Sequence, residues 1–130
     1  MKEKSLYPKI SELFKKDYDI IFEYRLPDNS GREIDILCLN KRKPEIIAIE
    51  TKIRDWRTAL RQAFTRLFYV DRSYIALPEK YLSKIDKALA KKYGIGVISV
   101  DGHAKIVQKA EKSSKVMKWR KEMIIKDISR

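Results

Sequence analysis

The sequence predicts an α/β fold in which helices flank one central mixed sheet. Short apolar runs bounded by turn residues alternate with stretches whose apolar residues recur every three or four positions, the patterns of strands and helices. The 130 residues contain no internal repeat and no Gly/Ser-rich linker, which indicates a single domain, residues 1–130. The expected order is helix, three strands, helix, strand, helix, strand.

The first half of the chain predicts a helix followed by a three-stranded meander. Leu6, Ile10 and Phe14 recur with helical spacing, so a helix is expected over about residues 6–16. The sequence Pro-Asp-Asn-Ser-Gly at residues 27–31 is a strong turn signal after the first strand. The three strands are expected at residues 20–26, 33–39 and 45–53.

The second half predicts helices that connect further strands of the same sheet. Trp56, Leu60 and Ala63 begin one apolar helical stripe, interpreted as core, and a second helix is expected over residues 79–93. Such helices supply the crossovers that a mixed sheet needs. Strands are expected at residues 73–77, 95–100 and 104–107, the core of the domain at about 6–100, and a basic helical tail at about 112–128.

Charge is the most informative feature of the composition. Thirty Lys and Arg against eighteen Asp and Glu give a net charge of +12 and an isoelectric point near 9.8. A strongly basic chain favours a polyanionic partner, of which nucleic acid is the commonest. The alternative is a charge-rich surface that serves solubility or thermal stability.

Membrane and redox signals are absent from the sequence. No segment approaches the run of about 18 apolar residues that spans a bilayer, and the charged N-terminal stretch has no signal-peptide pattern. We therefore expect a soluble, cytoplasmic protein with no membrane partner. The single cysteine, Cys38, lies in an apolar run and is interpreted as inert core.

Three charged residues are expected to meet at one edge of the sheet. Glu50 and Lys52 are two positions apart on one strand, and side chains two apart in a strand share a face. Asp35 lies near the start of the preceding strand. Antiparallel pairing places the start of one strand beside the end of the next, so Asp35, Glu50 and Lys52 should converge.

This combination of side chains suits phosphodiester hydrolysis. Two carboxylates provide the hard oxygen ligands that Mg²⁺ or Mn²⁺ prefers, and such a metal polarises a phosphate oxygen and acidifies a bound water. A nearby lysine can orient that water or stabilise the developing charge. In the structural alternative, Glu50 and Lys52 form a solvated ion pair at a strand end and Asp35 caps a turn.

The arrangement Asp-x14-Glu-x-Lys on a meander between two helices resembles the PD-(D/E)xK nuclease superfamily, which includes restriction endonucleases, Holliday-junction resolvases and repair nucleases. The similarity covers about residues 6–77 and implies a restriction-endonuclease-like αβββαβ core. It implies that Asp35 and Glu50 bind the metal and that Lys52 activates the water.

The resemblance also implies two supporting residues. Many members carry a glutamate on the first helix that completes the metal site, and Glu12 is the candidate here. Many carry a glutamine on the helix after the lysine, and Gln62 is the corresponding catalytic candidate. The motif's proline is absent before Asp35, where Ile34 stands, and the literal Pro-Asp at residues 27 and 28 is interpreted as coincidental because it lies in a turn.

Basic residues next to this motif are candidates for nucleic-acid binding. Arg54, Arg57 and Arg61 fall at i, i+3 and i+7, on one flank of the predicted helix that begins beside Lys52. A basic stripe there would hold phosphates in register but carries no base readout.

The sequence therefore favours a Mg²⁺- or Mn²⁺-dependent endonuclease that acts on DNA, with structured or branched DNA as one option and RNA also open. A homodimer is a further expectation, because the resolvases that the chain resembles cut two strands as dimers. Two other classes stay open: a catalytically inactive nucleic-acid-binding module on the same fold, and an interaction subunit whose basic surface meets an acidic protein.

Overall fold

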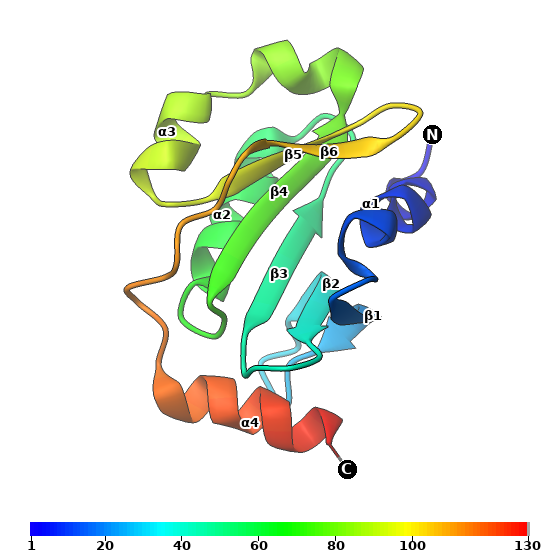
Figure 1. The fold of residues 1–130 in the computed structure, drawn as a ribbon. Coiled ribbons are helices and arrows are strands. Elements are labelled where there is room, and N and C mark those ends of the chain that lie inside the picture. Colours follow the sequence, from blue (N-terminus) through cyan, green and yellow to red (C-terminus); the bar gives the residue numbers. More distant parts are fainter. Residues whose placement is uncertain (130) are drawn as a thin grey trace.

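The computed structural model describes residues 1–129 and folds them around one six-stranded sheet (Figure 1). The strands are β1 (Tyr18–Arg25), β2 (Glu33–Asn40), β3 (Ile46–Thr51), β4 (Arg72–Pro78), β5 (Gly96–Val100) and β6 (Ala104–Gln108). Their order in space equals their order in sequence. β3, β4 and β5 are parallel, whereas the β1–β2, β2–β3 and β5–β6 pairs are antiparallel. The predicted α/β class with a mixed sheet is confirmed.

Helices connect the strands and cover the sheet. They are the 3-10 helix η1 (Glu3–Leu6), α1 (Tyr7–Phe14), α2 (Trp56–Arg66), the 3-10 helix η2 (Glu79–Lys84), α3 (Lys87–Lys92) and α4 (Lys118–Ile128). Pro8 stands in the first turn of α1, where a missing N–H costs nothing. Asp55 caps α2 by accepting a hydrogen bond from the Thr58 N–H.

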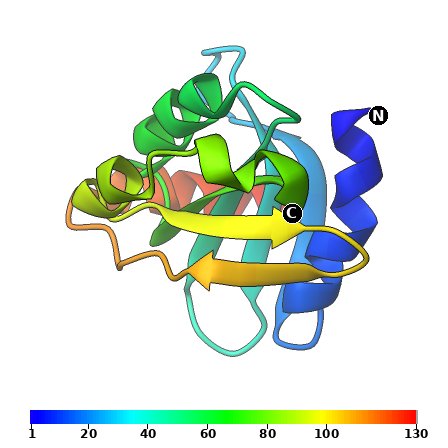
Figure 2. The same cartoon turned by 90° about the horizontal axis from the view of Figure 1, so that it is seen from above.

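The two faces of the sheet are covered by different helices (Figure 2). On one face, Ile10 and Phe14 of α1 pack with the even-numbered residues of β2, such as Ile36, and the odd-numbered residues of β3, such as Ile49. On the other face, α2 packs against β4 and β5. Because side chains alternate along a strand, Asp35 and Glu50 belong to the α2 face.

The C-terminal helix α4 packs on the α2 face of the sheet, and in Figure 1 it crosses below the strands. Ile124 is fully buried in the cluster that contains Leu37 and Ala48. Two polar contacts hold α4: the Tyr24 hydroxyl donates to Asp127 at 2.7 Å, and Lys121 pairs with Asp71 at 2.9 Å. The predicted tail helix therefore exists, but it begins at residue 118 rather than near 112.

The prediction of one continuous helix over residues 79–93 is wrong, because two shorter helices occupy this stretch. η2 and α3 are separated at Ile85, whose backbone is extended with φ −77° and ψ 134°. Asp86 follows and caps α3 by accepting from the Leu89 N–H at 2.9 Å. A side chain that bonds the nearby backbone competes with continued helix, which explains the break. Ile85 is nevertheless buried, as its place in the apolar pattern predicts.

Two expectations about individual features are confirmed. Cys38 is fully buried, and burial raises the pKa of its thiol to about 12, so it is an unreactive core residue. Trp56 is buried in the α2 core cluster. Within residues 1–129, no helix combines the length and apolar character that crossing a membrane requires.

We predict that Gly96→Ala destabilises the fold. A Cβ atom at residue 96 would overlap the buried ring of Tyr74 and stand 2.6 Å from the backbone nitrogen of Ala110. Overpacking of this kind lowers the free energy of unfolding by about 1–3 kcal/mol, measured by urea denaturation. Gly102→Ala is the control, because nothing lies within 4 Å of its Cβ position. Equal midpoints for both variants would show that a side chain at residue 96 fits beside Tyr74 without cost.

Candidate active site

Pairing of β2 with β3 brings Asp35 and Glu50 together. Ile36 pairs with Ile49 and Leu37 with Ala48, and the same register extended by one residue sets Asp35 opposite Glu50. Opposite residues of an antiparallel pair have Cβ atoms about 4.5–5.5 Å apart. The convergence of these two carboxylates at one end of β3 is therefore a consequence of strand register.

The Asp35 carboxylate is held in one orientation by Thr51. Its Oδ2 atom accepts hydrogen bonds from the Thr51 backbone N–H at 2.9 Å and from the Thr51 hydroxyl at 3.1 Å. Thr51 is fully buried at the end of β3, whereas Asp35 is half-buried. The pair thus fixes a carboxylate that still has access to solvent.

Glu50 forms a buried ion pair that the sequence did not predict. Its side chain is 1% exposed, and the Nε of Arg66, at the end of α2, donates to its Oε2 at 3.3 Å. Burial raises the pKa of Glu50 to about 8; the Arg66 charge opposes this shift and the Asp35 charge adds to it. The arginine therefore offsets only part of the cost of burying the carboxylate.

Arg66 also connects α2 to β2. It donates to the backbone carbonyl of Glu33 at 2.7 Å and to the Thr65 hydroxyl at 2.8 Å. Nothing in the sequence distinguishes this arginine from the other basic residues, although its position one helical turn after Gln62 places it on the side of α2 that faces the carboxylates.

The two carboxylates line a cleft of about 490 Å³ between β2, β3 and α2. Gln62 also lines it, and its side-chain oxygen is buried without a hydrogen-bond partner among residues 1–129. An unpaired buried acceptor is costly, so this oxygen is suited to a bound water or cation. The cleft, termed the carboxylate cleft, is lined by Gly31, Arg32, Glu33, Asp35, Glu50, Arg61, Gln62, Thr65 and Arg66.

Lys52 lies outside the residues that line the carboxylate cleft. Its ammonium stands 3.9 Å from the carboxylate of Glu3, on the N-terminal 3-10 helix, and its side chain is 24% exposed. β3 ends at Thr51, so the alternation that would align Lys52 with Glu50 no longer applies. The structure thus brings Asp35 and Glu50 together and places Lys52 at their flank.

Glu12 is likewise apart from the cleft. It is an exposed residue of α1 that pairs at 2.7 Å with Lys15, the residue that follows the helix. The N-terminal glutamate that contacts the motif lysine is Glu3. Sequence reasoning missed Glu3 because it precedes the periodic stretch that predicted the first helix.

Tyr7 is a further residue that sequence reasoning missed. It is buried on α1, and burial raises the pKa of its hydroxyl to about 12, with the Asp35 charge adding to the effect and the neighbouring Thr51 hydroxyl opposing it. Its ring stacks on Phe22 with centroids 5.3 Å apart. The first helix therefore reaches the Asp35–Thr51 pair through a neutral phenol.

The three candidate nucleic-acid-binding arginines are divided between two hollows. Arg61 lines the carboxylate cleft. Arg54 and Arg57 border a separate cavity of about 470 Å³, termed the basic hollow, whose other lining residues are Asp55, Trp56, Tyr81 and Lys84. The Nε of Arg54 donates to the Tyr81 hydroxyl at 3.1 Å, which fixes that guanidinium.

The side chains of the carboxylate cleft can hold Mg²⁺ only if water and substrate phosphate supply the rest of its ligands. Within residues 1–129, no group of three or more His, Cys, Asp or Glu side chains is arranged to hold a metal. Mg²⁺ is commonly bound by one or two carboxylates and completes its shell with water and substrate phosphate. Asp35, Glu50 and the free oxygen of Gln62 meet that requirement, provided that the metal competes with Arg66 for Glu50.

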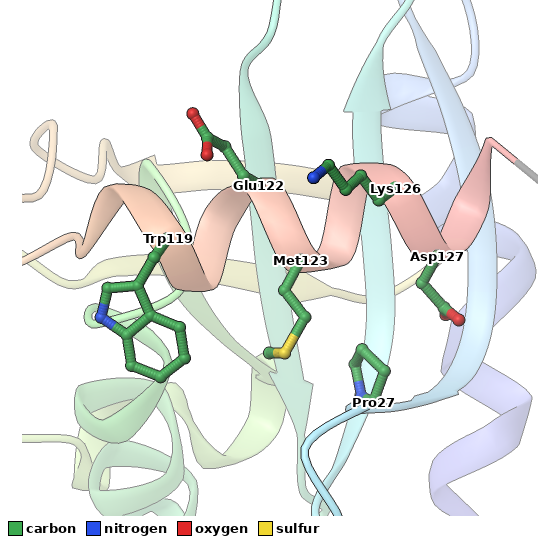
Figure 3. Close-up of a pocket in the computed structure, with 6 residues that line it drawn as sticks. All are labelled: Pro27, Trp119, Glu122, Met123, Lys126 and Asp127. Carbon is green, nitrogen blue, oxygen red and sulfur yellow. The ribbon is translucent and has the colours of Figure 1, made fainter.

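Another hollow, of about 440 Å³, lies between α4 and the loop after β1 (Figure 3). Pro27 faces Met123 there, and Trp119 lies at one end. Of its two carboxylates, Asp127 accepts from Tyr24 and Glu122 lies 4.0 Å from the Lys118 ammonium, so this hollow reflects how α4 docks on the sheet.

Comparisons with known proteins support the fold. The sequence matches no family model and no curated protein. The SPO1766 protein of Silicibacter pomeroyi, whose function is unknown, is 20% identical, with 99% of this chain and 85% of that chain covered at a TM-score of 0.76. EndoMS in its complex with double-stranded DNA is 17% identical over 75% of this chain, at a TM-score of 0.50. This chain matches 42% of EndoMS. A repair endonuclease of Pyrococcus abyssi is 14% identical over 86% of this chain and 48% of its own, at a TM-score of 0.46.

We predict that Arg66→Met makes stability strongly dependent on pH. Without the guanidinium, the buried Glu50 carboxylate is unpaired, which costs about 3 kcal/mol or more when it is ionised. A raised folded-state pKa stabilises at low pH, and that contribution is lost as pH rises through the folded pKa. Because Arg66 lowers the pKa of Glu50, which is about 8 when the guanidinium is present, its removal should raise that pKa further. Arg66→Met should therefore lose little stability relative to the unsubstituted protein near pH 5, and progressively more as pH rises above about 8.

Urea denaturation across this pH range measures the effect. Glu50→Gln combined with Arg66→Met is the matched control, because it removes the titrating group. If stability depends on pH in the same way in Arg66→Met and in the double variant, ionisation of Glu50 is not the cause of the loss.

Proposed function

We propose that this protein is a metal-dependent nuclease that hydrolyses DNA phosphodiester bonds at the carboxylate cleft. The observation that carries the proposal is the pair of Asp35 and Glu50, set opposite one another on β2 and β3 in a cleft that also holds the unpartnered oxygen of Gln62. The fold shared with DNA-bound EndoMS supports it, as does the net charge of +12.

Each residue of the cleft has a chemical task in this proposal. Asp35, held by Thr51, presents a fixed carboxylate, and Glu50 supplies the second one once it is released from Arg66. Mg²⁺ or Mn²⁺ bound there would polarise the phosphate and acidify a water. The Gln62 oxygen, which has no partner among residues 1–129, would complete this donor set, either as a ligand of the metal or as an acceptor for a water bound to it.

Positive charge at the cleft favours the transition state over the ground state. Arg61 and Arg66 line the cleft, and negative charge develops on the phosphate oxygens as water attacks the phosphorus. The Lys52 ammonium lies 3.9 Å from the Glu3 carboxylate. If it moves from Glu3 to the phosphate, Lys52 becomes the third cation at the cleft. If a metal replaces Arg66 as the partner of Glu50, the Arg66 guanidinium can turn to the same phosphate. Breaking this one ion pair thus frees Glu50 to bind the metal and frees Arg66 to bind the substrate.

A DNA-binding module without cleavage is the second candidate. The observation that favours it is the buried Glu50–Arg66 pair, which occupies one of the two carboxylates, together with the position of Lys52 outside the cleft. In that case the basic surface would bind phosphates and the carboxylates would serve only the fold.

We predict that the protein cuts DNA with Mg²⁺ or Mn²⁺ and not in EDTA. Asp35→Asn and Glu50→Gln each remove a metal-binding charge and should lower the rate by about 100-fold or more. Labelled single-stranded, duplex, flapped and four-way-junction DNA, with RNA beside them, form the substrate panel. Glu12→Gln is the matched control, because it neutralises an exposed carboxylate outside the cleft and should keep the full rate.

Two outcomes would redirect this proposal. If no substrate is cut while salt-sensitive binding persists, the protein is the binding module. If Glu12→Gln loses activity as Asp35→Asn does, the glutamate of the first helix takes part in the site, as the superfamily resemblance implies, and α1 must move to bring it there.

Metal binding can be tested without catalysis. A ligand that binds only the native state raises the melting temperature, so millimolar Mn²⁺ should raise it for the unsubstituted protein and for Glu12→Gln. Asp35→Asn should lose the rise. An equal rise in all three proteins would place the metal elsewhere.

A further inference from the structure

An apolar groove of about 540 Å³ lies between α2 and α3, beside the carboxylate cleft. Trp56 and Leu60, both largely buried, form its floor. Phe64, Leu89 and Tyr93 form its walls, and Tyr93 is 40% exposed. The rings of Phe64 and Tyr93 meet edge to face with centroids 5.2 Å apart. The groove thus offers aromatic surface to solvent.

Three hollows follow one another along α2. Arg61 and Thr65 line both the carboxylate cleft and the groove. Trp56 and Arg57 line both the groove and the basic hollow. A bound chain can therefore pass from the paired carboxylates, across aromatic surface, to a cluster of cations without leaving the helix.

The charged residues that line the groove, Arg57 and Arg61, are both positive. No acidic residue lines it; the Arg57 guanidinium lies 4.6 Å from the centre of the Trp56 ring, and the Lys115 ammonium lies 6.0 Å from that of Phe64. In the basic hollow, Tyr81 is surrounded by Arg54, Lys80 and Lys84, at 5.5, 5.2 and 6.0 Å from its ring centre. Aromatic faces among cations are the chemistry with which proteins bind single-stranded nucleic acid.

We propose that the groove binds one unpaired nucleobase of a DNA strand. Its flanking phosphates would lie at the carboxylate cleft on one side and at the basic hollow on the other. A base inside a duplex is stacked and paired, so it reaches such a groove only after it is extruded. The inference rests on the proposed function for the position of the cut, and it narrows the substrate to DNA that contains an unpaired nucleotide.

Binding tests this inference separately from cleavage. Asp35→Asn, in EDTA, is titrated into fluorescein-labelled DNAs of equal length: a full duplex, the duplex with one extra unpaired adenine, and the same DNA with an abasic residue in place of that adenine. Stacking of a single base strengthens binding by about tenfold. We therefore expect the unpaired adenine to bind about tenfold tighter than the other two, by fluorescence anisotropy.

Variants of the groove identify the binding surface. In the Asp35→Asn background, Tyr93→Ala should abolish the preference for the unpaired adenine, and Tyr93→Leu, which keeps apolar bulk without a ring, should abolish most of it. Trp119→Ala is the matched control, because Trp119 is an aromatic residue, 60% exposed, on α4. It should keep the preference. Lys84→Ala should weaken binding to all three DNAs alike.

Three results would overturn the inference. The first is equal affinity of Asp35→Asn for the three DNAs, and the second is an undiminished preference in Tyr93→Ala. The third is a protein dimer, seen by sedimentation, that Tyr93→Ala dissociates, which would make a second copy the occupant. If the nuclease proposal alone is wrong, DNA is not cut but the preference for the unpaired adenine persists.

Discussion

The buried ion pair between Glu50 and Arg66 is the constraint on which the site depends. A carboxylate that is 1% exposed inside a sheet is costly, and one guanidinium from α2 offsets part of that cost while it also binds the Glu33 carbonyl of β2. β2, β3 and the end of α2 are thereby fixed relative to one another. The walls of the carboxylate cleft follow from that arrangement, and so does a competition, because the carboxylate that a metal would need is already neutralised.

Much of the fold could be predicted from the sequence because its signals are local. The apolar runs of the strands and the Trp56 stripe of α2 lie where alternation and helical periodicity predict. The break at Ile85 could not be predicted from periodicity, since the apolar pattern continues through it. Its sign in the sequence is Asp86, which caps the start of a new helix, α3. Local periodicity detects which face is buried, not whether the backbone stays helical between buried positions.

Only the part of the candidate site that follows from strand pairing could be predicted from the sequence. Asp35 and Glu50 meet because their strands are antiparallel and the register is regular. Lys52 departs from the prediction because β3 ends one residue earlier, and Arg66 could not be foreseen because a buried arginine looks like a surface arginine in a basic chain. Its role depends on the depth at which α2 packs, which is a tertiary property.

The docking of α4 has a consequence for how the chain is made. The Tyr24 hydroxyl on β1 is bonded to Asp127, 103 positions later in the sequence, and Ile124 completes the apolar cluster that begins with β1 and β2. During synthesis the meander emerges early with this flank of the sheet uncovered. The apolar surface of β1 and β2 stays exposed, and so prone to aggregation, until α4 has been synthesised and packs on it. The N-terminal strands are therefore the segment in which a nascent chain would most need protection.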